Sequence, residues 1–263
     1  MKTLFAGLAA LCGFASFVAV GNAQDATVTF KSLRLDGHLV KWQKPSTDPE
    51  ITYQVATTPR EFAGARNCRG MTALDSLLVG SEISVPTFER ELAAAFAMWE
   101  AVAGLKFRQA RLGEPAEIVI GAQSDPEGWA FADVFYDAAS PQHVKPILQA
   151  LICFNPLRRW KVGFDGNLKA YDLRYTLAHE IGHAIGLDHP PGPGQIMNYR
   201  YEERFRDLQA GDVFGAVTLY GTPTRGTVAG FEREGHGRPT AKRGGTRAVE
   251  DVLNADPPAM PPH

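Results

Sequence analysis

The sequence has no excess of charge of either sign and no evident internal repeat. Its 263 residues include 27 Lys and Arg against 29 Asp and Glu, a formal net charge of −2. A chain this close to neutral carries no charge signature of a nucleic-acid-binding protein, and no nucleic-acid partner is expected. Hydrophobic residues make up 44% of the chain and charged residues 21%, which is typical of a globular protein with a core of its own.

Long hydrophobic runs are also absent, except at the N-terminus. Residues 1–23 read MKTLFAGLAALCGFASFVAVGNA, in which Lys2 precedes an apolar run that ends in small residues. This pattern predicts a secretory signal peptide cleaved near Ala23, and hence a secreted or periplasmic protein. A membrane anchor is the alternative, but the run is short and no stop-transfer charges follow it. No membrane span is therefore expected in the mature chain.

Cysteine is scarce, with three residues in the whole chain. Cys12 would leave with the signal peptide, and the mature chain would keep Cys68 and Cys153. An even pair in an oxidising compartment is compatible with one disulfide bond. Two free thiols, one exposed and one buried, are the alternative.

Strand and helix signals follow the signal peptide as far as residue 221. Alternating runs on either side of Asp36-Gly37 predict a β-hairpin, whereas residues 58–86, rich in Gly, Arg and Pro, are expected to form loops. Short strands are predicted at ITYQVA (51–56), AEIVIGA (116–122), WAFADVFY (129–136) and LQALICF (148–154). Helices are predicted within 87–107, 173–186 and 211–221, the second with Asp172 as its N-cap.

These signals divide the chain into four parts. The signal peptide occupies residues 1–23 and a short N-terminal segment follows at residues 24–41. A folded domain is expected over residues 42–222. Residues 223–263 are rich in Gly, Pro and charge without a sustained period, which predicts a disordered tail.

Three histidines fall within the eleven residues HEIGHAIGLDH. Residues four apart lie on one face of a helix, so His179 and His183 can direct two ring nitrogens at one point. Gly186 can adopt the left-handed conformation, end the helix and turn the chain back, so that His189 supplies a third nitrogen. Three imidazoles in this arrangement predict one Zn²⁺ whose fourth position is open to water, as in a catalytic zinc site.

Glu180 adjoins the first of these histidines and can reach that water. There its carboxylate would act as general base and then pass the proton to a leaving amine. The alternative is that the histidines are merely solvated or hydrogen-bonded residues of a helix. The five defined positions of the motif favour the metal site.

The stretch HEIGHAIGLDH, followed closely by IMNY, resembles the zinc motif and methionine turn of the metzincin metalloproteases. The matrixins, the matrix-metalloprotease-like branch, are the most similar. ITYQVA, AFAMWEAVAGLKF, EIVIGA, GWAFADVFY and LQAGDVFGAVTLYG resemble their strands and helices in the right order, over roughly residues 42 to 221. The resemblance implies an α+β zincin fold with a twisted, mostly parallel five-stranded sheet and three helices, and makes 42–222 a catalytic domain.

The resemblance also implies roles for residues near the zinc. Met197 would form the turn beneath the metal, or else be plain core. Asp212 would brace that turn, or else be a charge favoured at a helix start. Substrate would lie extended along the strand near Ala130, Phe131 and Ala132, and would pair with it by β-augmentation.

Tyr199 stands where matrixins tend to have proline. The astacin and serralysin branches place a tyrosine there that can approach the zinc and donate to the oxyanion. Tyr199 as a fifth ligand or transition-state donor and Tyr199 as a half-buried aromatic both stay open. Tyr201 and Phe205 beyond it would wall the side-chain pocket or belong to the core.

Other departures from the matrixin pattern concern bound ions and latency. Phe131 and Cys153 take the places of histidines that usually hold a second, structural zinc, so none is expected, and a Cys68–Cys153 disulfide could brace the sheet instead. Asn155 replaces an acid, which leaves calcium binding open. Residues 24–41 are too short for a globular pro-domain. A short pro-segment that blocks the zinc through Asp25 or Asp36 stays open, although Asp36 fits the hairpin turn better.

The sequence therefore predicts a secreted zinc endopeptidase, a monomer with one catalytic Zn²⁺, that cleaves protein or peptide substrates. A zinc-containing protein-binding module without proteolytic activity is the alternative from another class, and the presence of Glu180 argues against it. A protease nearer the serralysin or astacin branch is a milder alternative. The discriminating observation is whether the Tyr199 hydroxyl lies within bonding reach of the metal.

Overall fold

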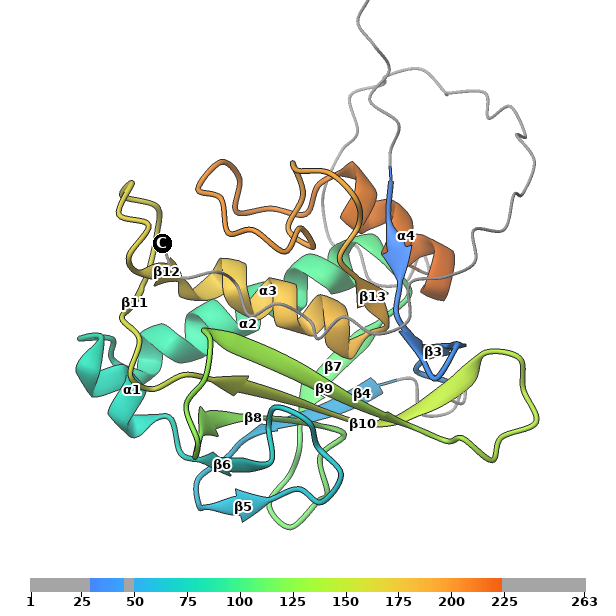
Figure 1. Ribbon diagram of the computed structural model, residues 1–263, viewed down its shortest axis with the longest axis horizontal. Helices are drawn as coiled ribbons and strands as arrows, with labels where there is room; N and C mark the ends of the chain where they lie inside the picture. The colour runs from blue at the N-terminus through green and yellow to red at the C-terminus, as the bar shows by residue number, and fades with distance from the viewer. Residues whose placement is uncertain (1–28, 45–49, 224–263) are drawn as a thin grey trace, which may run out of the picture.

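The structure, a computed structural model, describes residues 29–44 and 50–223 (Figure 1). The predicted signal peptide, its cleavage site near Ala23 and all but the first residue of the predicted tail lie outside the described residues. Within these residues, none of the helices combines the length and apolar character that crossing a membrane requires.

One mixed β-sheet forms the framework, and the longer helices lie over one of its faces (Figure 1). Its central strands follow one another in space as β7 (Lys106–Gln109), β4 (Glu50–Val55), β8 (Ile118–Gln123), β10 (Lys145–Phe154) and β9 (Ala130–Tyr136). The first four run parallel to one another, and β9 runs antiparallel to β10. The predicted five-stranded, mostly parallel sheet is confirmed.

The loop prediction for residues 58–86 was only partly right, since turns and irregular backbone alternate with short elements. This segment contains the short strands β5 (Arg60–Glu61) and β6 (Gly70–Thr72), and β6 pairs antiparallel with β8. It also contains a fourth helix, α1 (Asp75–Gly80), in addition to the three that were predicted. Each element is too short to show a hydrophobic period, because a helical or strand pattern needs several repeats to be recognised.

The three predicted helices are α2 (Val85–Val102), α3 (Leu173–Ala184) and α4 (Ala210–Tyr220). The apolar residues of α2 recur at helical spacing and are buried on one face: Phe88, Leu92, Phe96 and Trp99. Helices α2 and α3 pack side by side on the sheet, and the Trp99 indole donates a hydrogen bond to the Ala178 carbonyl, 3.0 Å away. This bond fixes α3, which carries the histidine motif, against α2.

The predicted hairpin at Asp36-Gly37 is confirmed. Strands β2 (Arg34–Leu35) and β3 (His38–Lys41) pair antiparallel across these two residues, which have φ angles of +49° and +80°. Positive φ at both central positions is what a tight type I′ turn requires, and Asp-Gly is a favoured pair for it. Strand β3 also pairs with the start of β10, so the hairpin lengthens the sheet.

Residues just before the hairpin pack against the histidine loop. Strand β1 (Lys31–Ser32) pairs antiparallel with β13 (Leu187–Asp188). The Lys31 ammonium lies 2.7 Å from an Asp188 carboxylate oxygen, and the Leu33 N–H donates to the Gly186 carbonyl at 2.8 Å. The part of the expected N-terminal segment that the structure describes thus supports the chain immediately before His189.

A second, smaller apolar cluster lies on the other face of the sheet. Side chains alternate between the two faces of a strand, so Val119 and Leu151 point away from the helices that cover their neighbours. Cys68 and Cys153 lie in this cluster and form a disulfide, with an S–S distance of 2.06 Å and a Cα–Cα distance of 5.7 Å. The disulfide joins the loop between β5 and β6 to the middle of the sheet (β10).

Candidate metal centre

Helix α3 has a defined start and stop. The Asp172 carboxylate caps it by accepting a hydrogen bond from the Tyr175 N–H at 2.9 Å. The helix ends at Ala184, and Gly186 follows with a φ of +95°. A Cβ atom on Gly186 would lie 2.5 Å from the Val40 carbonyl oxygen, so both the turn and the contact with β3 require glycine.

This turn brings the three histidine rings together. The Nε2 atoms of His179 and His189 are 3.0 Å apart, those of His183 and His179 are 3.1 Å apart, and those of His183 and His189 are 3.0 Å apart. Nitrogens bound tetrahedrally to one zinc ion are about 3.3 Å apart, so the three rings fit a single ion. Within residues 29–44 and 50–223, this is the one group of three His, Cys, Asp or Glu residues arranged to hold a metal.

Backbone carbonyls orient two of the rings. The Nδ1 atoms of His179 and His183 lie 2.7 Å and 2.9 Å from the carbonyl oxygens of Ile196 and Leu187. A carbonyl only accepts, so Nδ1 carries the proton and the Nε2 lone pair points into the cluster. Burial, followed by the repulsion between neighbouring imidazolium charges, lowers the pKa of His179 strongly and that of His189 to about 3. Neutral imidazoles are the form that binds a metal.

Glu180 lies next to the first ligand and is almost fully buried, with 3% of its surface exposed. In the part of the chain that the structure describes, no hydrogen bond or ion pair to protein occupies its carboxylate. Burial, and then the nearby Asp133, raise the pKa of Glu180 to about 8. A divalent cation beside it would lower this pKa by favouring the charged carboxylate. Because no group of the described protein binds the carboxylate, it can accept and release a proton.

A methionine lies beneath the histidine helix. Met197 is 2% exposed, and a Cβ atom on Gly182, between His179 and His183 on the helix, would lie 2.1 Å from its sulfur. The Asp212 carboxylate accepts hydrogen bonds from the N–H groups of Ile196, Met197 and Gln209, at 2.9, 3.0 and 2.8 Å. Asp212 thus braces the methionine turn and also caps α4.

Replacing Gly182 by alanine is expected to displace Met197 from beneath the helix. We expect a loss of about 1–3 kcal/mol in the free energy of unfolding, together with weaker zinc retention, because the new Cβ would displace the Met197 sulfur and also lie 3.0 Å from the Trp99 ring. Denaturant unfolding and metal dialysis measure these two effects. Gly80→Ala is the matched control, since nothing lies within 4 Å of its Cβ position; equal behaviour of the two variants would contradict the close contact.

Tyr199 lies beside the third ligand, with its ring centroid 6.3 Å from that of His189. Its hydroxyl accepts a hydrogen bond from Arg200 Nε at 2.8 Å, and the Arg200 guanidinium lies 5.3 Å from the Tyr199 ring centroid. The hydroxyl is therefore engaged by a neighbouring side chain in this structure. Tyr201 is 7% exposed and stacks on Tyr171 within the core, and Phe205 packs against the same core.

Strand β9, the predicted substrate strand, pairs only with β10 among the described strands, which leaves its other edge free. Its residues Ala130 and Ala132 face the helices, whereas Phe131 packs against the disulfide cluster on the opposite face. The Phe131 side chain therefore points away from the histidines, and only its backbone is placed to meet a substrate along the edge.

The residues discussed for a structural zinc or a calcium ion, Phe131, Cys153 and Asn155, all interact with other protein groups. Cys153 is in the disulfide, and Phe131 belongs to the same apolar cluster. The Asn155 amide donates to the Gly128 carbonyl at 3.0 Å, and its oxygen accepts from the Leu157 N–H at 2.9 Å. Asn155 thus stabilises the end of β10 through its own hydrogen bonds.

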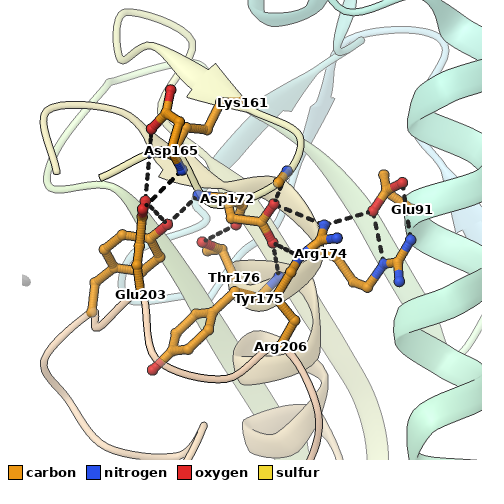
Figure 2. Close-up of polar contacts among 11 residues, drawn as sticks. Glu91, Lys161, Asp165, Asp172, Arg174, Tyr175, Thr176, Glu203 and Arg206 are labelled. Carbon is orange, nitrogen blue, oxygen red and sulfur yellow. Dashed lines mark hydrogen bonds and ion pairs between the residues drawn. The ribbon is translucent and has the colours of Figure 1, made fainter. Parts of the chain in front are cut away.

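Sequence reasoning missed an ionic network around the start of α3 (Figure 2). Arg206, in the loop beyond the methionine turn, donates to both oxygens of the fully buried Asp172, at 3.0 and 2.8 Å. It also donates to Glu91 of α2 at 3.0 Å, and Arg174 of α3 donates to the same Glu91 oxygen at 2.7 Å. Arg206 therefore ties the loop to both helices.

Sequence reasoning also missed a role for Asp133 of β9. One of its carboxylate oxygens accepts hydrogen bonds from three successive backbone N–H groups, those of Arg66, Asn67 and Cys68, at 2.8–2.9 Å. These bonds hold the loop that carries Cys68 against the edge strand β9. The partners are far apart in the sequence, and no local signal indicates them.

A helix with two metal-facing histidines, a third histidine beyond a glycine turn, a glutamate beside the first and a methionine beneath them define a zinc metalloprotease centre of the metzincin class. Comparison with protein families matches residues 79–221, more than half of the chain, to the family described as Matrixin. The chain therefore belongs to the matrixin family.

Individual relatives agree with this assignment. The chain is 31% identical to the macrophage metalloelastase of Rattus norvegicus over 143 aligned residues. The alignment covers 50% of this chain and 28% of the relative. It is 31% identical over 146 residues to the probable matrix metalloproteinase 095L of Invertebrate iridescent virus 3, covering 52% of this chain and 38% of that protein. The match thus spans between about a quarter and two fifths of the length of these relatives.

Proposed function

We propose that this protein is a secreted, zinc-dependent endopeptidase that hydrolyses peptide bonds in protein substrates. The observation that carries this proposal is the convergence of three imidazole Nε2 atoms, 3.0–3.1 Å apart, beside the unpaired carboxylate of Glu180. Neutral nitrogens fixed by backbone carbonyls suit Zn²⁺, and three protein ligands suit a catalytic site. Secretion rests on the signal-like residues 1–23.

Each residue has a defined task in this reaction. Bound by His179, His183 and His189, Zn²⁺ would supply Lewis acidity to the scissile carbonyl and to the attacking water. Glu180 accepts the proton of that water and delivers it to the leaving amine. Met197 and Asp212 take no part in the proton transfer. They fix the turn against which the zinc-ligand helix packs.

The free edge of β9 is the proposed substrate site. An extended peptide can add to it as a further strand, with backbone hydrogen bonds that do not depend on the sequence of the peptide. Ala130, Phe131 and Ala132 would contribute backbone groups to this pairing. Small side chains at positions 130 and 132, on the histidine side, would leave room for the substrate.

A binding module without activity would have no use for a buried, unpaired carboxylate at Glu180, which costs free energy to maintain. A mechanism of the astacin or serralysin kind would need the Tyr199 hydroxyl to leave Arg200 and approach the metal. The matrixin mechanism, in which Glu180 alone handles the proton, requires no such movement.

Casein digestion tests the proposal. The purified protein is expected to degrade casein, to lose this activity on dialysis against a zinc chelator, and to recover it when zinc is restored. Absence of cleavage by the zinc-loaded protein would favour the binding module, and cleavage that survives complete metal removal would exclude the metal mechanism.

A further inference from the structure

The ammonium group of Lys161, at the end of β11 (Trp160–Lys161), is surrounded by oxygen atoms from two separate loops (Figure 2). It forms an ion pair with Asp165, donates to the carbonyl of Asn167 at 2.8 Å and lies 2.5 Å from a carboxylate oxygen of Glu203. Two carboxylates and a carbonyl around one positive charge resemble the oxygen ligands that a calcium ion takes in proteins.

These oxygen atoms come from the two segments that flank the histidine helix. Asp165 and Asn167 lie in the loop that leads into α3, whereas Glu203 lies in the loop beyond the methionine turn. The other oxygen of Glu203 accepts hydrogen bonds from the N–H groups of Asp165 and Gly166, at 3.1 and 2.7 Å. Lys161 therefore completes a junction between the two loops.

The junction continues to the start of the helix. The Tyr201 hydroxyl donates to Glu203 at 2.9 Å and accepts from the N–H of Asp172, the N-cap of α3, at 2.8 Å. Glu203 therefore connects the Lys161 ammonium to the first turn of the zinc-ligand helix. Tyr199, beside His189, lies only two residues before Tyr201 on the same loop.

The Lys161 ammonium stabilises the junction strongly because its ion pair with Glu203 is largely buried. The side chains of Lys161 and Glu203 are 12% and 7% exposed, so water can replace little of their interaction. Burial by itself lowers the pKa of Lys161, but the hydrogen bonds to Asp165 and Glu203 together outweigh it, so the pKa is raised. Without the ammonium, the buried carboxylate of Glu203 would lose its cation and lie beside the negative charge of Asp165, whose side chain is 61% exposed; an uncompensated buried charge is destabilising.

We propose that Lys161 is a built-in cation that holds the loop of Tyr199–Arg206 against the loop preceding α3, at a set of oxygen atoms that a calcium ion could bind if the ammonium were removed. Lys161 is a positioning residue, since it acts on the zinc-ligand helix through Glu203 and Tyr201. The expected change in KM rests on the proposed peptidase function, whereas the expected calcium response of the unfolding midpoint does not. Because Lys161 already supplies the cation, we expect this junction to need no calcium in the native protein.

Thermal unfolding of Lys161→Met in calcium-free buffer, with and without added millimolar calcium, tests the proposal. The side chain keeps its apolar length but loses its charge, and we expect the midpoint to fall by about 4–8 °C. Calcium should restore at least half of this loss in the variant and leave the native protein unchanged. Lys161→Arg, which retains a cation, should need no calcium.

Lys44→Met is the matched control. Lys44 forms an ion pair with Glu117, 2.8 Å away and just before β8, with side chains 18% and 27% exposed; here a single carboxylate offers no comparable set of oxygen atoms. Calcium should not shift its midpoint. Equal calcium responses of the Lys161→Met and Lys44→Met variants, or a Lys161→Met midpoint equal to that of the native protein, would overturn the proposal.

A kinetic measurement separates positioning from general stability. Well below the unfolding temperature, Lys161→Met is expected to raise KM for an extended peptide substrate about tenfold, with a smaller change in kcat, and calcium should lower KM again. A KM equal to the native value would exclude the positioning role. If the native protein cleaves no peptide, the proposed peptidase function fails, while the melting experiment still decides the role of Lys161.

Discussion

Replacing Glu180 by glutamine is expected to lower kcat/KM for peptide hydrolysis by about 10²- to 10⁴-fold. The amide has the shape of the carboxylate but cannot take a proton from water. The Glu180 side chain makes no hydrogen bond within the described protein, so the substitution removes no structural contact. Zinc content should stay at the native level, because the three imidazoles are unchanged. Steady-state kinetics and metal analysis on one preparation measure both quantities.

Glu89→Gln provides the control for this experiment. Glu89 is an exposed carboxylate on α2, so its substitution should change neither hydrolysis nor zinc content. Native activity in Glu180→Gln would show that another group accepts the proton. Loss of zinc from that variant would show that Glu180 acts as a ligand rather than as a base.

Removal of the Cys68–Cys153 disulfide is expected to produce the largest loss of stability. The bond closes a loop with a sequence separation of 85, and the chain-entropy relation assigns about 4–5 kcal/mol to a loop of that size. Both cysteines are fully buried, so the double serine variant also places hydroxyl groups in an apolar cluster. A decrease of about 10 °C or more in the melting temperature should follow.

The same bond supports the proposed substrate strand. Cys68 is one of the three residues whose N–H groups bind Asp133 of β9, so the loosened loop should also release that strand. Reduction of the native protein is the control, and it should lower its melting temperature while leaving that of the serine variant unchanged. Equal stability of the native protein before and after reduction would contradict the assignment.

Features with short-range causes were predictable from the sequence. The hairpin depends on Asp36-Gly37, the start of α3 on Asp172 as N-cap, and the return of His189 on the positive φ of Gly186. In each case the residue that determines the backbone lies within a few positions of its effect. The histidine centre follows because helical spacing and one glycine turn determine most of its geometry.

Features that depend on distant partners were not predictable. Strand β1 forms only because β13 lies beside it, and two-residue strands have no period of their own. Arg206 meets Asp172 and Glu91, and Lys161 meets Glu203, across large separations in the sequence. Charged residues in loops usually remain in solvent, so their types alone do not indicate that these side chains join the two loops flanking the zinc-ligand helix.

X-ray absorption at the zinc edge on the purified, zinc-loaded protein tests the central claim most directly. Convergence of His179, His183 and His189 predicts one zinc per chain with three imidazole nitrogens at about 2.0–2.1 Å and one further light ligand. The His189→Ala variant should show one imidazole fewer, or no bound zinc. A native spectrum with two imidazoles or fewer, or one unchanged by that substitution, would contradict the account.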